Sequence, residues 1–197
     1  MRTRDENKEK AILREALHMI VKEGFDGLSM QKVAKAAGVS PATIYIYFKD
    51  RDDLILQLYA RIVEKYFKFI LQDFNPESTF AEGMRVQWKR RAQFALEHQE
   101  VGLFMEHITY TPLHYRAQEI LSPDFRNMMA RFSEKAIANG ELRQMPNFEV
   151  YWSIAFAPLM QLIKSHQVGY THKGEPFELT DEILYTTLEM VLKALKP

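Results

Sequence analysis

The chain has 197 residues, of which 47% are hydrophobic, and its 26 basic and 26 acidic residues give a formal net charge of zero. This much apolar side chain can build a sizeable core in one or two domains, and the balanced charge does not by itself indicate a nucleic-acid-binding protein. The absence of cysteine excludes thiol catalysis, zinc–thiolate sites, iron–sulfur clusters and disulfide scaffolds.

The sequence has no obvious membrane-spanning segment. Its longest apolar stretch, residues 150–163, contains Pro158 and Gln161 and is shorter than the roughly 18 residues that a spanning helix needs. The N-terminal sequence MRTRDENKEK is charged and has no apolar signal-peptide core behind it. We therefore expect a soluble, cytoplasmic protein with no membrane partner.

The first two expected helices are bounded by clear local signals. Apolar residues at helical spacing run from Ala11 to Val21, and Gly24 is suited to cap the end of this helix. Ser29 is expected to cap a second helix that stops at Gly38.

The next two helices also begin with capping residues. Ser40 is expected to cap a third helix with Pro41 in its first turn, where the missing N–H costs nothing. Asp50, with Asp53 three residues later, opens a longer helix that should end near Asn75 and Pro76. The aspartates at 50, 52 and 53 are interpreted as complementing the dipole of this helix.

The rest of the chain has helical periodicity and only weak strand signals, so we predict an all-α fold of about nine helices. Pro158 should kink the penultimate helix because it cannot bond to the carbonyl of Ile154. The segment 168–178, with two glycines and a proline, is predicted to be a long loop. The further helices are expected over residues 80–98, 101–110, 122–139, 147–169 and 179–195.

The spacing of Ala34, Gly38, Val39 and Ile44 is that of a helix-turn-helix. A small residue lets the second helix approach, the glycine adopts a left-handed backbone conformation, and the two apolar residues fill the angle between the helices. A tight corner in a helical bundle is the alternative interpretation, and it would place the tyrosines of the following helix in the core.

Helix phase argues against burying both tyrosines. Ile44 and Phe48 lie four residues apart and suffice as core anchors, so Tyr45 and Tyr47 should flank them. Residues 27–49 contain three lysines and no acidic residue, which makes a basic surface. We expect these tyrosine hydroxyls to donate to phosphate oxygens of DNA.

The segment GVSPATIYIYFKDRDDL, which follows GLSMQKVAKAA, resembles the N-terminal signature of the TetR family of bacterial transcriptional regulators. In that family the pattern runs Gly-Val-Ser, two residues, Thr, an aliphatic residue, Tyr, one residue, Tyr or His, Phe, two residues, a basic residue, two residues and Leu. The resemblance covers residues 8–60, and beyond it only helix pattern and total length agree. The matching residues are Gly38, Val39, Ser40, Thr43, Ile44, Tyr45, Tyr47, Phe48, Arg51 and Leu54.

The resemblance implies a three-helix DNA-binding domain over residues 1–50 and a helical-bundle ligand-binding and dimerisation domain over residues 51–197. With no Lys or Arg from Pro41 to Phe48, a bidentate guanine contact is not available to the recognition helix. Thr43 is then its main polar base reader, and part of the specificity should come from Gln31, Lys32, the N-terminal residues Arg2 and Arg4, or DNA shape. The expected DNA-binding residues are Ser29, Gln31, Lys32, Ser40, Pro41, Ala42, Thr43, Tyr45, Tyr47, Lys49 and Arg51.

The resemblance also implies a small-molecule cavity in the C-terminal bundle, although most aromatic residues there can equally be core. The expected ligand-binding residues are Trp88, Phe104, His107, Trp152 and Phe156. Because they include almost no basic residue, we expect an apolar or cationic aromatic effector. No metal site or cofactor is expected: His107 and His114 are seven residues apart, but Thr111-Pro112 interrupts the helix that would align them.

The last expected helix carries a long apolar stripe that is interpreted as a dimer interface. By resemblance, the last two helices pair with those of a second subunit. The interface residues are expected to be Leu184, Leu188, Val191 and Leu195.

The predicted function is a homodimeric, ligand-responsive regulator, a repressor, that binds a palindromic double-stranded operator and is released by a small molecule. Two alternatives remain: a DNA-binding regulator without a ligand, and a helical enzyme or lipid-handling protein. The enzyme alternative is disfavoured because the sequence has no Gly-rich phosphate loop, HExxH motif, nucleophile elbow or carboxylate dyad.

Overall fold

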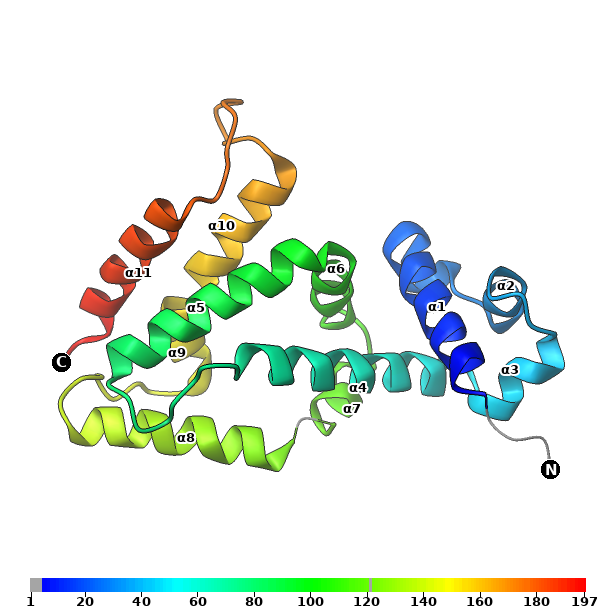
Figure 1. The fold of residues 1–197 in the computed structure, drawn as a ribbon, viewed down its shortest axis with the longest axis horizontal. Helices are drawn as coiled ribbons and strands as arrows, with labels where there is room; N and C mark the ends of the chain where they lie inside the picture. Colours follow the sequence, from blue (N-terminus) through cyan, green and yellow to red (C-terminus); the bar gives the residue numbers. More distant parts are fainter. Residues whose placement is uncertain (1–4, 121) are drawn as a thin grey trace. The chain divides into compact units, whose positions relative to one another are not determined.

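A computed structural model describes residues 5–120 and 122–197, and within these ranges it contains helices and no strand, which confirms the all-α prediction (Figure 1). None of the helices in the described ranges is long and apolar enough to span a membrane. The helices are α1 (Glu6–Gly27), α2 (Met30–Ala36), α3 (Pro41–Tyr47), α4 (Arg51–Ile70), α5 (Phe80–Glu97), α6 (Gln99–Ile108), α7 (His114–Gln118), α8 (Pro123–Ala138), α9 (Phe148–Ala155), α10 (Ala157–Val168) and α11 (Asp181–Leu195).

The helices form two compact units. The first contains the described residues up to Lys65 together with those from His98 to Ile120, and the second contains Tyr66–Glu97 and Ser122–Pro197. The continuous helix α4 contributes residues to both units. The boundaries of these compact units differ from the predicted functional domains, residues 1–50 and 51–197. That functional division stays a prediction.

The capping residues of the first unit act as predicted. The Ser29 side chain accepts a hydrogen bond from the N–H of Lys32, and the Ser40 side chain accepts one from the N–H of Thr43. Gly38 has a φ of 66°, the left-handed conformation required for the turn between α2 and α3. Gly24, with a φ of 74°, does interrupt the helical conformation, although α1 resumes and reaches Gly27.

The first turn of α4 is closed by two aspartates. Asp50 Oδ1 accepts from the N–H of Asp53, and Asp53 Oδ2 accepts from the N–H of Lys49, each over 2.8 Å. This resembles the predicted capping box, except that Asp53 bonds to the N–H of Lys49 and not to that of Asp50. At its other end α4 stops at Ile70, earlier than the expected Asn75 and Pro76.

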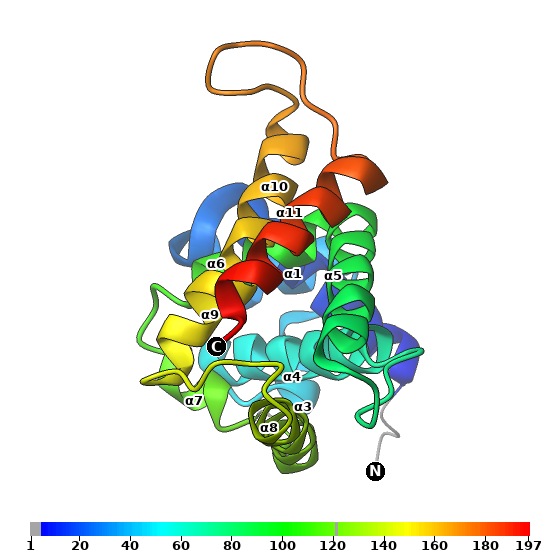
Figure 2. The same cartoon turned by 90° about the vertical axis from the view of Figure 1, so that its left-hand side faces the viewer.

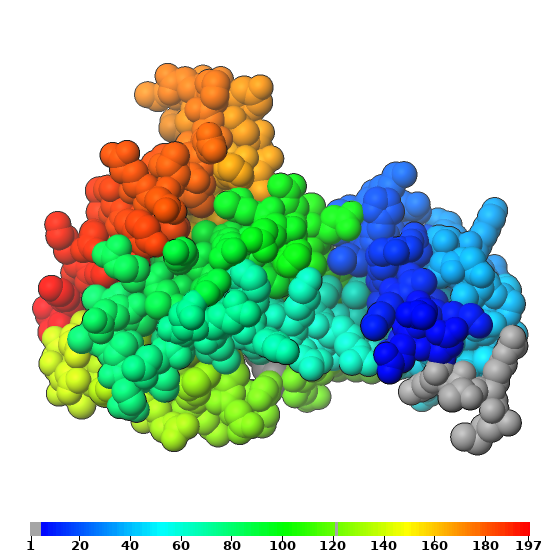
Figure 3. Space-filling view, in the orientation of Figure 1, coloured from blue at the N-terminus to red at the C-terminus, as the bar shows by residue number. Residues whose placement is uncertain are grey.

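The core of the second unit forms where α5 packs against α8, α10 and α11. It is built from large apolar side chains of segments far apart in the sequence, among them Trp88, Phe132, Leu159 and Leu188. Figure 2 shows α10 and α11 running side by side, and the segment between them projects from the bundle as the predicted long loop (Figures 2 and 3).

Two features of the helix pattern differ from the sequence prediction or refine it. The stretch 147–169 forms two helices, α9 and α10, because the chain leaves helical geometry at Phe156, two residues before Pro158. This break is the expected effect of a proline that cannot donate a backbone hydrogen bond. The short helix α7 was not predicted, because five residues are too few to show a hydrophobic period.

Candidate functional site

Helix α3 presents an exposed face with little charge. Ile44 and Phe48 are fully buried and anchor the helix, as predicted. On the opposite side Pro41, Ala42 and Tyr45 are exposed, and Tyr45 has 56% of its surface accessible. The surface that a recognition helix would turn to DNA is therefore apolar, with one phenolic hydroxyl.

Tyr47 is placed differently from the prediction. Only 5% of its surface is accessible, and its hydroxyl accepts a hydrogen bond from the N–H of Asp5 over 2.9 Å. Asp5 caps the start of α1, so this bond connects the end of α3 to the beginning of α1. The expectation of an exposed hydroxyl is wrong because the last turn of α3 lies against the N-terminal segment, which helix phase alone does not reveal.

The three lysines of the basic segment have different surroundings. Lys32 Nζ lies 3.0 Å from the carboxylate of Glu23 and donates to the carbonyl of Gly27 over 3.1 Å. The counter-charge comes from α1, outside the acid-free stretch of sequence. Lys35 and Lys49 are exposed, and no described residue forms an ion pair with either of them.

Arg51 is not an outward-pointing phosphate ligand as expected. Its Nε donates to the carbonyl of Leu28 over 3.2 Å, and its Nη2 donates to the carbonyl of Phe25. These carbonyls lie at the C-terminal end of α1, where the usual partners four residues along the chain are missing, and that of Phe25 also accepts from the N–H of Leu28 over 3.2 Å. The guanidinium thus acts as a cap for α1, which explains why it turns inward.

The remaining expected DNA contacts include several residues that also hold the helices. Ser29 and Ser40 are the caps of α2 and α3, and the Thr43 hydroxyl bonds to that of Ser40 over 2.7 Å. Gln31 is exposed on α2. Arg2 and Arg4 of the predicted N-terminal arm lie outside the described residues.

The five expected ligand-binding residues are not brought together. Phe104 belongs to the first unit, where its ring packs 5.9 Å from that of Phe25, and His107 is exposed in the same unit. Trp88, Trp152 and Phe156 belong to the second unit. The selection from sequence failed for Phe104 and His107 because helical spacing does not say which unit a helix packs in.

Trp88 is a core residue, fully buried, and its indole N–H donates to the carbonyl of Ala155 over 2.9 Å. Trp152 and Phe156 surround a buried cation that the sequence analysis overlooked. The guanidinium of Arg91 lies 4.5 Å from the ring centre of Phe156 and 5.5 Å from that of Trp152. The sequence feature that could have indicated this buried cation is the spacing of Gln87 and Arg91, one helical turn apart on α5. Polar pairs at this spacing are, however, common on exposed helix faces.

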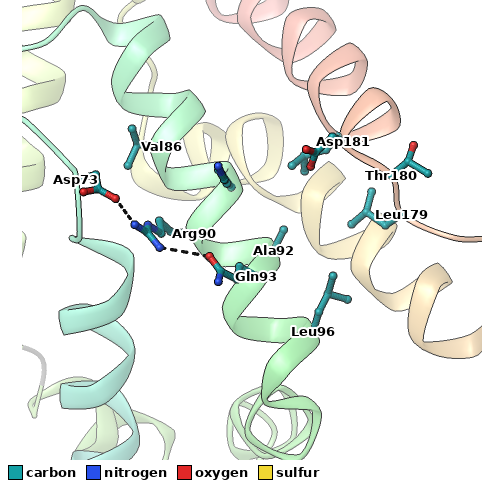
Figure 4. Close-up of a pocket in the computed structure, with 11 residues that line it drawn as sticks. Asp73, Val86, Arg90, Ala92, Gln93, Leu96, Leu179, Thr180 and Asp181 are labelled. Atoms are coloured by element: carbon teal, nitrogen blue, oxygen red, sulfur yellow. Dashed lines mark hydrogen bonds and ion pairs between the residues drawn. The ribbon is translucent and has the colours of Figure 1, made fainter.

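A concave region of the same unit lies between α5 and the beginning of α11 (Figure 4). Its volume is about 630 Å³, within the range of small-molecule sites. Leu96, Leu179 and Leu184 provide apolar walls, and Lys89 and Asp181 add charge at its margin. Arg90, which also lines it, pairs with Asp73.

The four residues expected at a dimer interface are core residues. Leu184, Leu188, Val191 and Leu195 are all buried within the unit, where α11 packs against α5, α9 and α10. The expectation was wrong because one chain already covers this stripe. The outward side of α11 instead carries Thr186, Met190 and Ala194, of which Met190 is 64% accessible.

Residues 12–58 match the family described as bacterial regulatory proteins, tetR family. An uncharacterized HTH-type transcriptional regulator of Haemophilus influenzae is 37% identical over 40% of this chain, which corresponds to only 42% of that relative. The fatty acid metabolism regulator protein of Bacillus subtilis is 25% identical over 68% of this chain and 70% of its own.

Solved structures extend the similarity to the whole chain. A TetR family transcription regulator from Marinobacter aquaeolei superimposes with a TM-score of 0.76 and 27% identity, covering 100% of this chain and 99% of its own. The regulator FadR of Bacillus subtilis, solved in complex with stearoyl-CoA, has a TM-score of 0.74 at 17% identity, covering 94% and 98%, and shares the fold. With the capped helix-turn-helix of α2 and α3 and the helical second unit, these similarities show that residues 12–58 belong to the tetR family of bacterial regulatory proteins and that the whole chain has the fold of TetR family regulators.

Proposed function

We propose that this chain is a repressor of transcription that binds a palindromic operator as a homodimer and is released by a small molecule. The observation that carries the proposal is α3: its buried side anchors it through Ile44 and Phe48, while the opposite side is exposed. The tetR family match of residues 12–58 and the fold of the whole chain support the same function.

The composition of the exposed face of α3 defines how it would read DNA. It has no Arg, Lys, Asn or Gln for bidentate contacts to a purine, so apolar contacts to thymine methyl groups remain, from Pro41, Ala42 and Ile46. Tyr45 would donate to a phosphate, and the unpaired Lys35 and Lys49 would add attraction that does not depend on sequence.

The homodimer would form through the outward sides of α10 and α11. Met160 on α10 and Met190 on α11 are both exposed, and a second copy could cover them without disturbing the buried stripe of α11. Apolar side chains such as methionine are enriched in such interfaces. Two-fold symmetry would then match the two half-sites of a palindrome.

The effector would act through α4. This helix begins at Arg51, next to the helix-turn-helix, and its final residues belong to the second unit, so it connects the two units without interruption. An effector bound in the second unit that displaces α4 would change the spacing of the two recognition helices. A coupling of about 1–3 kcal/mol would weaken operator binding roughly 5- to 150-fold.

Selection of bound sequences from random double-stranded DNA tests the DNA-binding part. We expect a palindrome whose half-sites are about one helical turn apart. Tyr45→Phe should weaken binding to all sequences alike, whereas Thr43→Ala and Ala42→Gly should change base preference. Tyr110→Phe alters another exposed tyrosine of the first unit and serves as the control.

Three results would contradict this proposal: no enriched palindrome, a change in base preference caused by Tyr45→Phe, or an effect of Tyr110→Phe as large as that of Tyr45→Phe. A reporter gene placed behind the selected site then distinguishes a repressor from an activator, since deletion of the regulator should raise expression.

A further inference from the structure

Arg91, on α5 in the second unit, is a buried cation. Only 5% of its surface is accessible. Arginine keeps its charge in proteins and carries five N–H donors. A charge removed from water in this way is costly unless an opposite charge lies beside it.

The described surroundings of Arg91 provide hydrogen-bond acceptors but no negative charge. Nη1 donates to the Tyr66 hydroxyl, and Nη2 donates to Gln87 Oε1 over 3.2 Å. Nε is buried and has no acceptor among the described residues. Nor does any described carboxylate form an ion pair with this guanidinium.

Tyr151 cannot supply the missing charge. Its burial raises the pKa of the phenol to about 12, although the positive charge of Arg91 acts in the opposite direction. The phenol is therefore protonated and neutral at physiological pH.

The neighbouring Arg90 differs from Arg91 in having a carboxylate partner. Arg90, on another side of α5, pairs with the carboxylate of Asp73 and donates to Gln93 (Figure 4). Arg91 is more deeply buried and would gain more from a carboxylate, yet its neighbours are aromatic. The cost of burying its charge is thus only partly offset by the faces of the rings.

Several aromatic rings lie close to the Arg91 guanidinium. The guanidinium lies 4.5 Å from the Phe156 ring centre and 5.6 Å from that of Tyr66, and the rings of Trp152 and Phe156 are 4.9 Å apart. Phe156 stands at the break between α9 and α10, where its backbone leaves helical geometry. A cation beside aromatic rings suits a ligand with a negative group and an apolar body.

We propose that Arg91 binds the carboxylate of the effector, and that Trp152 and Phe156 contact the apolar body of the same molecule. This inference rests on the proposed ligand response and specifies the chemical class of the ligand. It replaces the expectation of a cationic or purely apolar effector, because a cation would be repelled by Arg91 and a molecule without a hydrogen-bond acceptor would leave Nε unsatisfied.

Paired probes with the same body and different head groups test this proposal. Decanoate is compared with decanol, and 2-naphthoate with 2-naphthylmethanol, by intrinsic tryptophan fluorescence and by the melting temperature of the full chain. Trp88 and Trp152 are the only tryptophans, and both lie in the second unit. At least one carboxylate should bind about 10- to 100-fold more tightly than its alcohol, as expected for a charge-assisted hydrogen bond.

Substitutions of Arg91 and of its neighbour Arg90 test whether Arg91 causes the effect. Arg91→Met replaces the cation by an apolar chain of similar length; it should abolish the preference for the carboxylate while leaving the protein folded, because a buried unpaired charge is removed. Arg90→Met removes the neighbouring cation and should keep the preference. If Arg91→Met does not fold, Arg91→Lys should fold and retain a reduced preference, because lysine keeps the charge but not the planar fork.

The inference is overturned if neither carboxylate binds the wild-type protein, if acids and alcohols bind equally, or if the preference survives in Arg91→Met. Operator binding is measured in parallel. A carboxylate that binds through Arg91 and leaves operator affinity unchanged would refute the ligand response while keeping the site, whereas intact operator binding without carboxylate binding would refute the site alone.

Discussion

Two arginines, the partly buried Arg51 of the first unit and the buried Arg91 of the second, use their hydrogen bonds differently. Arg51 donates to the carbonyls of Phe25 and Leu28, and the Tyr47 hydroxyl accepts from the N–H of Asp5. Arg91 instead contacts Tyr66 and Gln87 through their side chains and keeps one donor without an acceptor.

Hydrogen bonds to the backbone and hydrogen bonds between side chains have different consequences. Backbone groups are fixed by the helices themselves, so bonds to them hold α1, α3 and α4 in one arrangement. A network of side chains with an unsatisfied donor can be completed by a ligand. The first unit is therefore suited to present a rigid surface to DNA, and the second is suited to respond to a small molecule.

The largest expected effect concerns the two sides of α11. Leu188→Asp places a carboxylate at a position with no accessible surface and should destabilise the chain by about 3–5 kcal/mol, as for other uncompensated buried charges. Urea unfolding followed by circular dichroism measures this loss. Met190→Asp lies on the outward side; it should leave stability nearly unchanged but produce a monomer in analytical ultracentrifugation. The opposite result would be a Leu188→Asp variant that is folded but monomeric and a Met190→Asp variant that stays dimeric. It would show that the dimer interface includes the apolar stripe of α11.

A smaller loss of stability is expected at the cap of α1. Arg51→Met leaves the carbonyls of Phe25 and Leu28 without the guanidinium and should cost about 1.5–3 kcal/mol, the range for hydrogen bonds to charged groups. Arg61→Met, on the same helix, removes only an exposed ion pair with Glu9 and should cost about 0–1 kcal/mol. Equal urea midpoints for the two variants would show that the cap contributes no more than a surface pair.

Substitution of one helical glycine in each unit tests how tightly the helix around it is packed. At Gly83 on α5 an added methyl group would overlap the buried ring of Phe132, so Gly83→Ala should destabilise by about 1–2 kcal/mol even after its gain in helix propensity. Gly102 on α6 has open space around it, so Gly102→Ala should stabilise by about 0.5–1 kcal/mol. The melting temperatures of the two variants show whether each substitution stabilises or destabilises the protein. Stabilisation by Gly83→Ala would mean that the Phe132 ring can move to make room for the methyl group.

The smallest effect is confined to alkaline pH. Because the pKa of Tyr151 is raised to about 12, above the value of 10.0 for an unburied phenol, the folded state favours the protonated form. Its contribution is fully present below pH 10 and is lost as the pH rises toward 12. Tyr151→Phe should reduce this alkaline loss by about 1–2 kcal/mol without changing stability at pH 7.

Burial also raises the pKa of Tyr59 in the first unit, so part of the alkaline loss should persist in Tyr151→Phe and decrease further in the double variant with Tyr59→Phe. Identical pH profiles for the wild type and Tyr151→Phe would contradict the burial of this phenol.

Local sequence signals were sufficient to predict most of the helices, many of their ends, and the turn between α2 and α3, but not α7 or the division of residues 147–169 into α9 and α10. These features depend on interactions over a few residues: Ser29 and Ser40 bond to N–H groups three positions along the chain, and Gly38 needs only its own backbone freedom. Pro158 similarly acts on the neighbouring helical turn. Such local signals are complete in the sequence.

The tertiary structure decided which side chains are available for function. Tyr47 and Arg51 had the right residue types for phosphate contacts, but Asp5 and the carbonyls of Phe25 and Leu28, more than twenty residues away, turned them inward. The stripe of α11 was correctly recognised as apolar, yet only packing against α5 made it core. Hydrophobic periodicity specifies that a face is buried and not what buries it, because that depends on contacts between segments far apart in the chain.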